Sequence, residues 1–410
     1  MRYIYFFSLL TLLVVSKTQA QVLTGEDSLS AGLVADNRKT LISGYGEARF
    51  SLDYKQRNAD ANLSRVVLFV GHNFNKNISL FTEMELEDAL VAGKTEGITG
   101  GGSIGMEQAF LKFNLNPTNY IVAGLFLPRL GIINENHLPT TFNGTTRPYL
   151  EQLLIPATWR SLGIGFYGNN AHLPGLHYTL AISNGLNSEL FQQNSGIREG
   201  RQQGSHASGY NACINASLLY YYKKFRFQYS TFYGGSSALE QRVADSLGLN
   251  KGLFANAVFL QECNAQYRHQ GVELKIIACM MKVKNANNIN QVFANNIASS
   301  MQGAYAELAY NFLHKQRGEK AKYLAAFGRV EYVDLNVNVP ENGIRNEANQ
   351  QYYYVGGITY KPTRGVSLKF DYTYRITGEQ NTALVVTPFP QLTPYYTHKG
   401  FINLGMGYNF

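Results

Sequence analysis

Apolar and polar residues alternate along most of this chain with a period of two. Between Val366 and Ile376, valine, leucine, isoleucine and aromatic residues alternate with serine, lysine, aspartate, threonine and arginine. Such segments of about ten residues, separated by turn residues, are the signature of transmembrane β-strands. We therefore expect an all-β fold, a transmembrane antiparallel β-barrel of about 16 strands. The predicted strands are 41–54, 63–74, 78–88, 104–115, 119–127, 160–168, 176–184, 209–222, 225–234, 254–269, 271–283, 301–313, 321–334, 350–360, 366–377 and 399–410.

The connections between these segments alternate between short and long. Bacterial barrels have an even number of strands, short periplasmic turns and long extracellular loops, so both chain ends are expected on the periplasmic side. All eleven prolines fall in loops, turns or strand ends, where a missing N–H breaks no ladder bond. The weakest strand is 254–269, where the adjacent polar residues Gln261 and Glu262 indicate a bulge or a misplaced boundary. Short links are predicted at 75–77, 116–118, 169–175, 223–224, 270, 314–320 and 361–365, and longer ones at 55–62, 89–103, 128–159, 185–208, 235–253, 284–300, 335–349 and 378–398.

Composition excludes two other classes of fold. Charged residues make up 16% of the 410 residues, against about 25% in soluble domains, and aromatic residues make up 13%. In hydrocarbon every backbone polar group must be paired, so only helices and closed barrels span a membrane. Beyond the N-terminus no apolar run is long enough for a spanning helix. A soluble β-sandwich would need a dry core on the second strand face, which here carries Glu, Lys, Arg, Asn and Ser.

One end of the chain resembles an export signal and the other a signature for assembly into the outer membrane. Arg2, the apolar run 4–15 and the small residues before Gln21 predict a cleaved signal peptide over 1–20. A short periplasmic extension (21–40) and the barrel (41–410) follow. At the other end, an apolar row finishing at Phe410 resembles the C-terminal signature that the barrel-assembly machinery recognises. We expect a multi-pass barrel in the lipid of a Gram-negative outer membrane.

The row opposite the apolar one should face the barrel interior. Sixteen strands leave room for an aqueous channel, and side chains of both signs would line it. Each of these charges could instead form an ion pair within the wall. The candidate pore-wall residues are Arg49, Arg65, Glu83, Glu85, Glu87, Lys112, Arg226, Lys275, Arg329, Glu331, Lys369 and Arg375.

No catalytic, cofactor or metal motif is present. The eight histidines lie mostly at turns and loops, and neither a CxxC pair nor HExxH occurs, so we expect no enzyme, no cofactor and no metal site. Cys263 should face residue 278 across a hairpin, which leaves Cys279 on the opposite sheet face. The formal net charge of +8 falls to about +6 after cleavage, and this positive charge favours anions as the solutes. We expect no nucleic-acid partner.

The longest segment without strand alternation is 128–159. It holds four of the eleven prolines and ends at the single tryptophan, Trp159. We expect it to fold into the barrel and narrow the channel; the alternative is an external lid or a trimer contact. Candidate constriction charges are Arg129, Glu135, His137, Arg147 and Glu151.

Several segments resemble the phosphate-selective porin O and P family. They are SGYGEARFSLDY (43–54), ISLFTEMELEDA (78–89), IGMEQAFLKF (104–113), YIVAGLFLPRLGI (120–132), FGRVEYVDLN (327–336) and YVGGITYKPTRGVSLKFDYTY (354–374). The resemblance implies a sixteen-stranded homotrimeric channel whose third extracellular loop folds inside. Family members commonly carry a lysine where this chain has Leu127.

Two function classes follow. The first is a porin for passive diffusion of small hydrophilic solutes or ions, with a possible anion or phosphate preference. The alternative is a barrel that takes up a specific or hydrophobic ligand, or a structural barrel closed by its own loop. Residues 21–40 are too short and polar for the plug that a hydrophobic transporter would be expected to carry.

Overall fold

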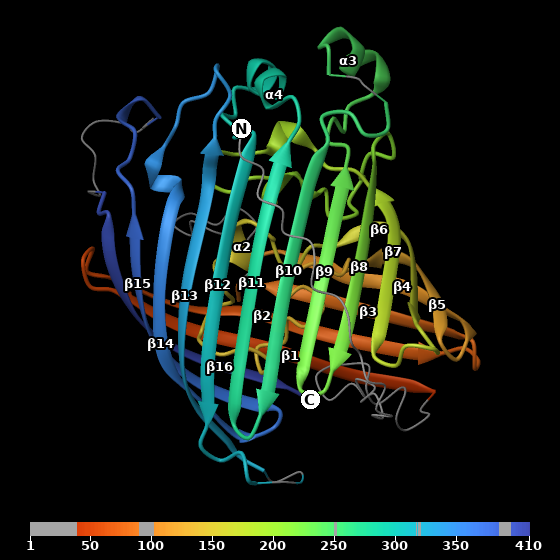
Figure 1. Cartoon of the computed structure of the whole chain (residues 1–410), viewed down its shortest axis with the longest axis vertical. Coiled ribbons are helices and arrows are strands. Elements are labelled where there is room, and N and C mark those ends of the chain that lie inside the picture. Colours follow the sequence, from red (N-terminus) through yellow and green to blue (C-terminus); the bar gives the residue numbers. More distant parts are fainter. Residues whose placement is uncertain (1–38, 90–101, 250–251, 317, 319–320, 385–394) are drawn as a thin grey trace, which may run out of the picture.

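The protein is a closed barrel of sixteen antiparallel strands (Figure 1). The computed structural model describes residues 39–89, 102–249, 252–316, 318, 321–384 and 395–410. The predicted signal peptide and nearly all of the predicted extension lie outside these residues. The strands are β1 Thr40–Asp53, β2 Asn58–Asn73, β3 Ile78–Glu87, β4 Ile104–Asn116, β5 Asn119–Phe126, β6 Ser161–Asn169, β7 Leu176–Asn184, β8 Ala212–Tyr222, β9 Phe225–Gly234, β10 Val258–His269, β11 Val272–Val283, β12 Ser300–Asn311, β13 Tyr323–Asn338, β14 Gln350–Thr363, β15 Val366–Thr377 and β16 His398–Asn409.

The barrel closes where the last strand meets the first. β16 pairs with β1 in antiparallel register, with Tyr45 opposite Asn409 and Asp53 opposite Phe401. Phe410 continues this ladder, because its N–H donates to the Gly44 carbonyl at 3.0 Å and its own carbonyl accepts from the Gly44 N–H at 3.2 Å. Closure leaves no unpaired strand edge. The prediction of a sixteen-stranded antiparallel barrel is confirmed.

The two faces of the sheet are inverted relative to a soluble protein. On β15, Leu368 and Phe370 are 45% and 44% exposed on the outside, whereas Lys369 and Asp371 point inward and are 6% and 1% exposed. The same contrast recurs around the barrel, with exposed Leu, Ile, Phe and Tyr outside and buried Ser, Thr, Asn and charged residues inside. A period of two in the sequence therefore becomes an apolar outer surface and a polar inner one.

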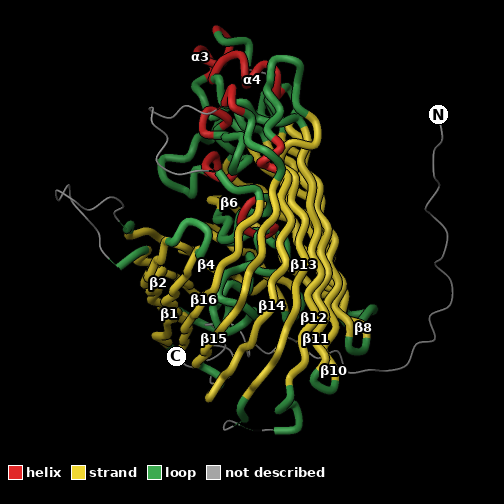
Figure 2. Tube along the Cα trace, turned by 90° about the vertical axis from the view of Figure 1, so that its left-hand side faces the viewer, coloured by secondary structure: helices red, strands yellow, loops and turns green. Residues whose placement is uncertain are grey.

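Apart from the short β1–β2 turn, the longer loops and all helices of the described residues follow odd-numbered strands, so they gather at one end of the barrel or extend into it from that end (Figure 2). None of the helices in the described part of the chain is long and apolar enough to cross a membrane. Short turns join the strands at the opposite end. The helices are α2 Leu150–Leu153, η1 Ser188–Leu190, η2 Arg198–Arg201, α3 Gln241–Ser246, α4 Ala286–Phe293, η3 Glu347–Asn349 and η4 Thr382–Leu384.

Three details differ from the predictions. β2 begins at Asn58, so the first link is a short turn rather than the loop 55–62; small polar residues there hid the alternation. β10 begins at Val258 and pairs without a register shift, so the boundary of 254–269 was misplaced and no bulge exists. A register shift does occur in β4, where Glu83 of β3 faces Gln108 and the next residue, Met84, faces Met106.

Part of the interior is apolar, contrary to the expectation that the apolar row of each strand faces lipid. On β11 the inward row changes from Glu273 and Lys275 to Ile277 and Met281. These side chains join a buried cluster with residues of the loop between β5 and β6. The core of this protein therefore sits inside the barrel. Its strand members include Val258, Leu260, Ile277, Met281, Met301, Val333 and Leu335, and its loop members Leu130, Ile132, Ile133, Leu150, Leu154, Ile155 and Trp159.

Candidate functional site

The β5–β6 loop (residues 127–160) packs against inward-facing side chains of the barrel wall. Its helix α2 contacts β12 and β13. The first N–H of α2, at Leu150, donates to the carboxylate of Glu331 on β13 at 2.9 Å. A helix N-terminus has unpaired N–H groups that favour a negative charge, so a carboxylate from the barrel wall anchors this turn.

Glu151 organises the loop itself. One carboxylate oxygen accepts the N–H groups of Ile132 and Ile133 at 2.8 and 2.7 Å, and the other accepts the Tyr305 hydroxyl at 2.7 Å. Burial raises the pKa of Glu151 to about 7, against these hydrogen bonds, which lower it. Gly131 has φ +69°, and a Cβ there would lie 2.5 Å from a Glu151 oxygen, so glycine is required beside the carboxylate. Glu151 was predicted to line the constriction; in the structure its side chain is fully buried.

Further carboxylates of the wall hold other parts of the loop. Glu262 of β10 accepts the Gly131 N–H at 3.2 Å, and Asp371 of β15 accepts the Thr145 N–H at 2.6 Å. On β13, Arg329 is fully buried and donates to Glu331 at 2.7 Å and to Glu307 at 3.0 Å. Toward β10–β15 the loop is therefore held by an apolar cluster together with hydrogen-bonded charges.

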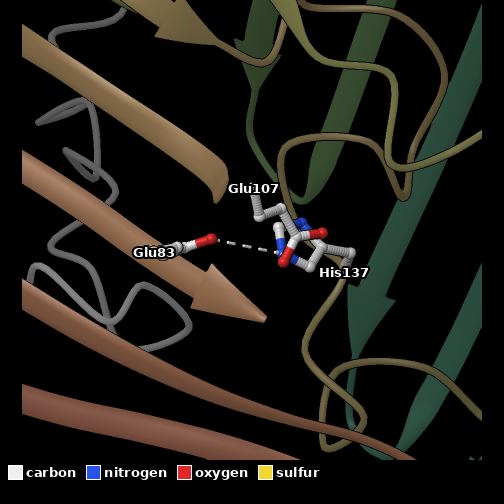
Figure 3. Close-up of side chains that lie close together, drawn as sticks. All are labelled: Glu83, Glu107 and His137. Atoms are coloured by element: carbon white, nitrogen blue, oxygen red, sulfur yellow. Dashed lines mark ion pairs between the residues drawn. The ribbon is translucent and has the colours of Figure 1, made fainter. Parts of the chain in front are cut away.

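Toward β3 and β4 the loop meets a different arrangement. His137 of the loop lies between Glu83 of β3 and Glu107 of β4, and the three side chains point toward one another (Figure 3). His137 Nε2 is 3.7 Å from Glu83 Oε2 and 3.6 Å from Glu107 Oε2. Burial lowers the pKa of His137, but the carboxylates of Glu107 and Glu83 outweigh it and raise the pKa to about 9.

A cavity of about 260 Å³ borders this cluster. Glu83 and His137 line it together with Lys112 and Glu135, which supply one charge of each sign. The remaining wall is largely aromatic. Its aromatic lining residues are Phe69, Phe81, Phe110, Tyr120, Phe126 and Tyr167.

The predicted constriction charges fall into four environments. Arg129 and Glu135 form an ion pair of 2.6 Å within the loop, and Glu135 reaches the cavity. His137 joins the two carboxylates of the wall. Arg147 is buried and donates to the His137 carbonyl at 3.4 Å, and burial lowers its pKa. Glu151 belongs to the loop core described above.

Most predicted wall charges contact another charge or an aromatic ring. Arg226 donates to Gln228 at 3.0 Å, whereas Arg49 and Glu87 are exposed. The ion pairs are Arg65 with Glu85, Lys275 with Glu307 and Arg329 with Glu331; the cation–ring contacts are Lys112 over Tyr120, Lys369 over Phe142 and Arg375 over Phe401.

Sequence reasoning missed Glu107. Strict alternation from Gln108 places residue 107 on the outer face, but the register shift in β4 leaves Glu107 unpaired with β3 and buried beside His137. A β-bulge inserts one residue and re-aims a side chain. The only signal in the sequence is that two consecutive polar residues, Glu107 and Gln108, interrupt the alternation.

Comparisons with known proteins agree on the fold. No family model matches this sequence, so the resemblance to phosphate-selective porins stays a prediction. An uncharacterized protein of Aquifex aeolicus (strain VF5) is 28% identical over 343 residues, covering 81% of this chain and 74% of that protein.

Solved structures of outer-membrane proteins superpose on nearly the whole chain. Salmonella typhi OmpF in complex with daunomycin has a TM-score of 0.53 at 14% identity, covering 92% of this chain and 98% of that one. The anion-selective porin from Comamonas acidovorans has a TM-score of 0.52 at 9% sequence identity, covering 90% of this chain and 99% of that one. In-vitro folded OmpT of Vibrio cholerae, in its trimer form, has a TM-score of 0.50 at 10% sequence identity, covering 90% of this chain and 99% of that one. Identities this low show a shared barrel architecture and nothing finer.

Proposed function

We propose that this protein is an outer-membrane porin, a water-filled channel for passive diffusion of small hydrophilic solutes or ions. The inverted burial of the strands carries the proposal: apolar side chains are exposed outside a closed barrel and charged ones point inward. An outward apolar band suits lipid, because every strand N–H and C=O is paired within the closed sheet. The protein would be exported with a cleaved signal peptide. It would be inserted by the barrel-assembly machinery through the strand ending at Phe410.

The proposed path runs between the β5–β6 loop and strands β2–β6. The cavity lies on this side, and Lys112, Glu135 and His137 reach it. The opposite side of the interior is filled by the apolar cluster. A solute would therefore pass Arg129, Glu135 and His137 at the loop and Lys112 at the wall, whereas Glu151 stays out of the path.

We propose a weak preference for anions and a homotrimeric assembly. The net charge of about +6 after signal-peptide cleavage and the exposed Arg49 favour anions, although Glu83 and Glu135 border the path. Two structures that share the fold are named an anion-selective porin and a trimer form. Strong phosphate selectivity is not part of the proposal, and neither is any enzymatic step.

One observation favours the alternative function, uptake of an aromatic or otherwise apolar ligand. Six aromatic rings line the cavity, and apolar walls with a few polar groups are typical of ligand pockets. The two functions differ in conductance, because a ligand-specific barrel need not pass ions steadily.

Planar-bilayer recording of the purified protein tests the channel. We expect stable ion-conducting steps, and a larger step after deletion of residues 134–146, which removes the part of the loop beside the cavity. Deletion of 240–247, around the outer helix α3, should leave the step unchanged. A barrel that inserts but never conducts would rule out the porin and favour ligand uptake.

A further inference from the structure

We propose that Glu83, Glu107 and His137 bind a divalent transition-metal ion of the Zn²⁺ class, and that this ion fastens the β5–β6 loop to the barrel wall. The three side chains come from β3, β4 and the loop, so an ion between them would join three separate segments (Figure 3). No sequence motif indicated a metal here, because the three residues follow no ligand spacing along the chain.

The separations of the three side chains fit an ion better than a direct hydrogen bond. His137 Nε2 lies 3.7 and 3.6 Å from the nearest oxygens of Glu83 and Glu107, and one ligand atom from each residue lies within 4.8 Å of the others. Hydrogen bonds to nitrogen span about 2.7–3.2 Å. Ligand atoms bonded tetrahedrally at ~2.0–2.2 Å to Zn²⁺ lie about 3.3–3.6 Å apart. The observed distances are close to the second range and outside the first.

The three groups also have unused bonding capacity. Glu83 Oε2, Glu107 Oε1 and His137 Nε2 are buried and have no hydrogen-bond partner in the described part of the chain. The residues themselves are 5%, 0% and 5% exposed. Nearly all buried polar atoms in proteins are hydrogen-bonded. Glu83 Oε2 faces His137 Nε2 directly, whereas Glu107 meets the same nitrogen through its other oxygen, Oε2. Spare bonding capacity on all three residues of one buried cluster therefore indicates a missing ligand.

Neighbouring groups orient the proposed ligands. His137 Nδ1 lies 3.1 Å from the Asn134 carbonyl oxygen. A carbonyl can only accept, so Nδ1 must donate, and an ion that displaces the Nε2 proton meets a lone pair at Nε2. The Tyr45 hydroxyl donates to Glu107 Oε2 at 2.7 Å. Metal-binding imidazoles and carboxylates are commonly held by such outer hydrogen bonds.

Arg65 and Arg147 place positive charge beside the cluster, but neither forms an ion pair with its three residues within the described part of the chain. Arg65 pairs with Glu47 at 2.8 Å and with Glu85 at 3.2 Å. Among the described residues, His137 is the only ion-pair partner of Glu83 and of Glu107. The cavity borders Glu83 and His137 and provides a route for a hydrated ion. One imidazole with two carboxylates suits Zn²⁺, whereas Mg²⁺ and Ca²⁺ prefer oxygen ligands alone.

Calorimetric titration of the chelator-treated full-length protein with Zn²⁺ in detergent tests the site. We expect one saturable site that both His137→Gln and Glu107→Gln weaken by at least about 100-fold, since losing a ligand costs more than losing an outer partner. Tyr45→Phe keeps the ring, removes one outer hydrogen bond, and should weaken binding by about tenfold. His172→Gln, on the exposed turn between β6 and β7, is the matched control for surface histidines and should bind as the wild type does.

Circular dichroism and heat-modified gel mobility report whether each variant folds. Should His137→Gln or Glu107→Gln fail to fold, Tyr45→Phe still tests the site, because the proposal requires it to bind more weakly than the His172→Gln control. Wild-type protein without a saturable Zn²⁺ site, or folded variants that bind like the wild type, would overturn the proposal. His137 would then hold the two carboxylates through a proton alone.

The consequence for transport rests on the proposed channel function. We expect Zn²⁺ to reduce current fluctuations in the wild type and to leave His137→Gln unaffected, because the ion restrains the loop beside the path. Zn²⁺ binding without any conductance would contradict the proposed porin function and support the metal site. Conductance without Zn²⁺ binding would contradict the metal site and support the porin function.

Discussion

The β5–β6 loop is attached to the barrel on two sides, and the attachments are built differently. Toward β10–β13 it packs into an apolar cluster, and both oxygens of Glu151 receive hydrogen bonds. Toward β3 and β4 it presents His137 to Glu83 and Glu107, and each of the three residues has a buried atom without a hydrogen-bond partner among the residues that the structure describes.

The difference distinguishes the side of the loop that stabilises its fold from the side that is open to a ligand. Deep burial by itself does not distinguish the two sides, since Glu151 and Glu107 are both fully buried. On the packed side both oxygens of Glu151 are hydrogen-bonded beside apolar side chains, which stabilises one arrangement of the loop. Converging unsatisfied groups next to a cavity retain free bonding capacity, and this is where a ligand can bind. The experiments below test whether the two attachments differ in this way.

The largest effect is expected at Arg329 on the packed side. Arg329→Met removes the guanidinium between Glu307 and Glu331, so that the buried Glu331 keeps no ion-pair partner among the described residues and Glu307 keeps Lys275 alone. Breaking a buried pair in this way costs about 3–5 kcal/mol. Urea unfolding in lipid vesicles measures the loss. Arg198→Met, which removes an exposed arginine 3.6 Å from Glu199, should cost no more than ~1 kcal/mol. Equal losses in both variants would contradict a structural role for the packed side.

The second effect concerns Glu151 and depends on pH. Its pKa is raised from 4.5 to about 7 by burial, so between these values the folded state holds a proton that the unfolded state has released. Stability from this group is therefore present below pH 4.5 and is lost as pH rises through 7. The loss amounts to about 1.4 kcal/mol per pKa unit.

Glu151→Gln cannot ionise and should lack this slope. Its side-chain oxygen can still accept the N–H groups of Ile132 and Ile133. Between pH 5 and pH 8, the free energy of unfolding of the variant should rise relative to that of the wild type by on the order of 3 kcal/mol. Urea unfolding at the two pH values measures the difference, and a constant difference would show that Glu151 does not titrate in this range.

The smallest effect is expected for the charges that reach the cavity. A unit charge about 8 Å from a permeating ion contributes roughly 0.5 kcal/mol in water, or about twofold in relative permeability. Lys112→Gln should lower the anion-to-cation permeability ratio by about this factor, and Glu135→Gln should raise it. Reversal potentials in a KCl gradient measure both. A shift of the same sign in both variants would mean that the path does not pass these residues.

How far the sequence predicted the candidate site depended on the register. Alternation placed Glu83, Lys112 and Arg329 on the interior face. The prediction that Cys263 and Cys279 are offset by one residue, and so lie on opposite faces of the sheet, is also confirmed. Cys263 pairs with Ala278, and Cys279 pairs with Glu262. Alternation failed at Glu107, where one inserted residue reverses the faces from that point. It also could not tell that Ile277 and Met281 face a folded loop, since an apolar residue suits either lipid or a core.

The sequence alone determined the barrel: the number of strands, their inner and outer rows and the closing strand at Phe410. Local periodicity encodes these features, because each strand must offer one face to an apolar and one to a polar environment. Only the tertiary structure decided that Glu151 is a buried organiser of the loop, and that Glu107 meets Glu83 and His137. Those contacts join residues far apart in the chain, and they depend on a bulge and on a loop path that no local pattern specifies.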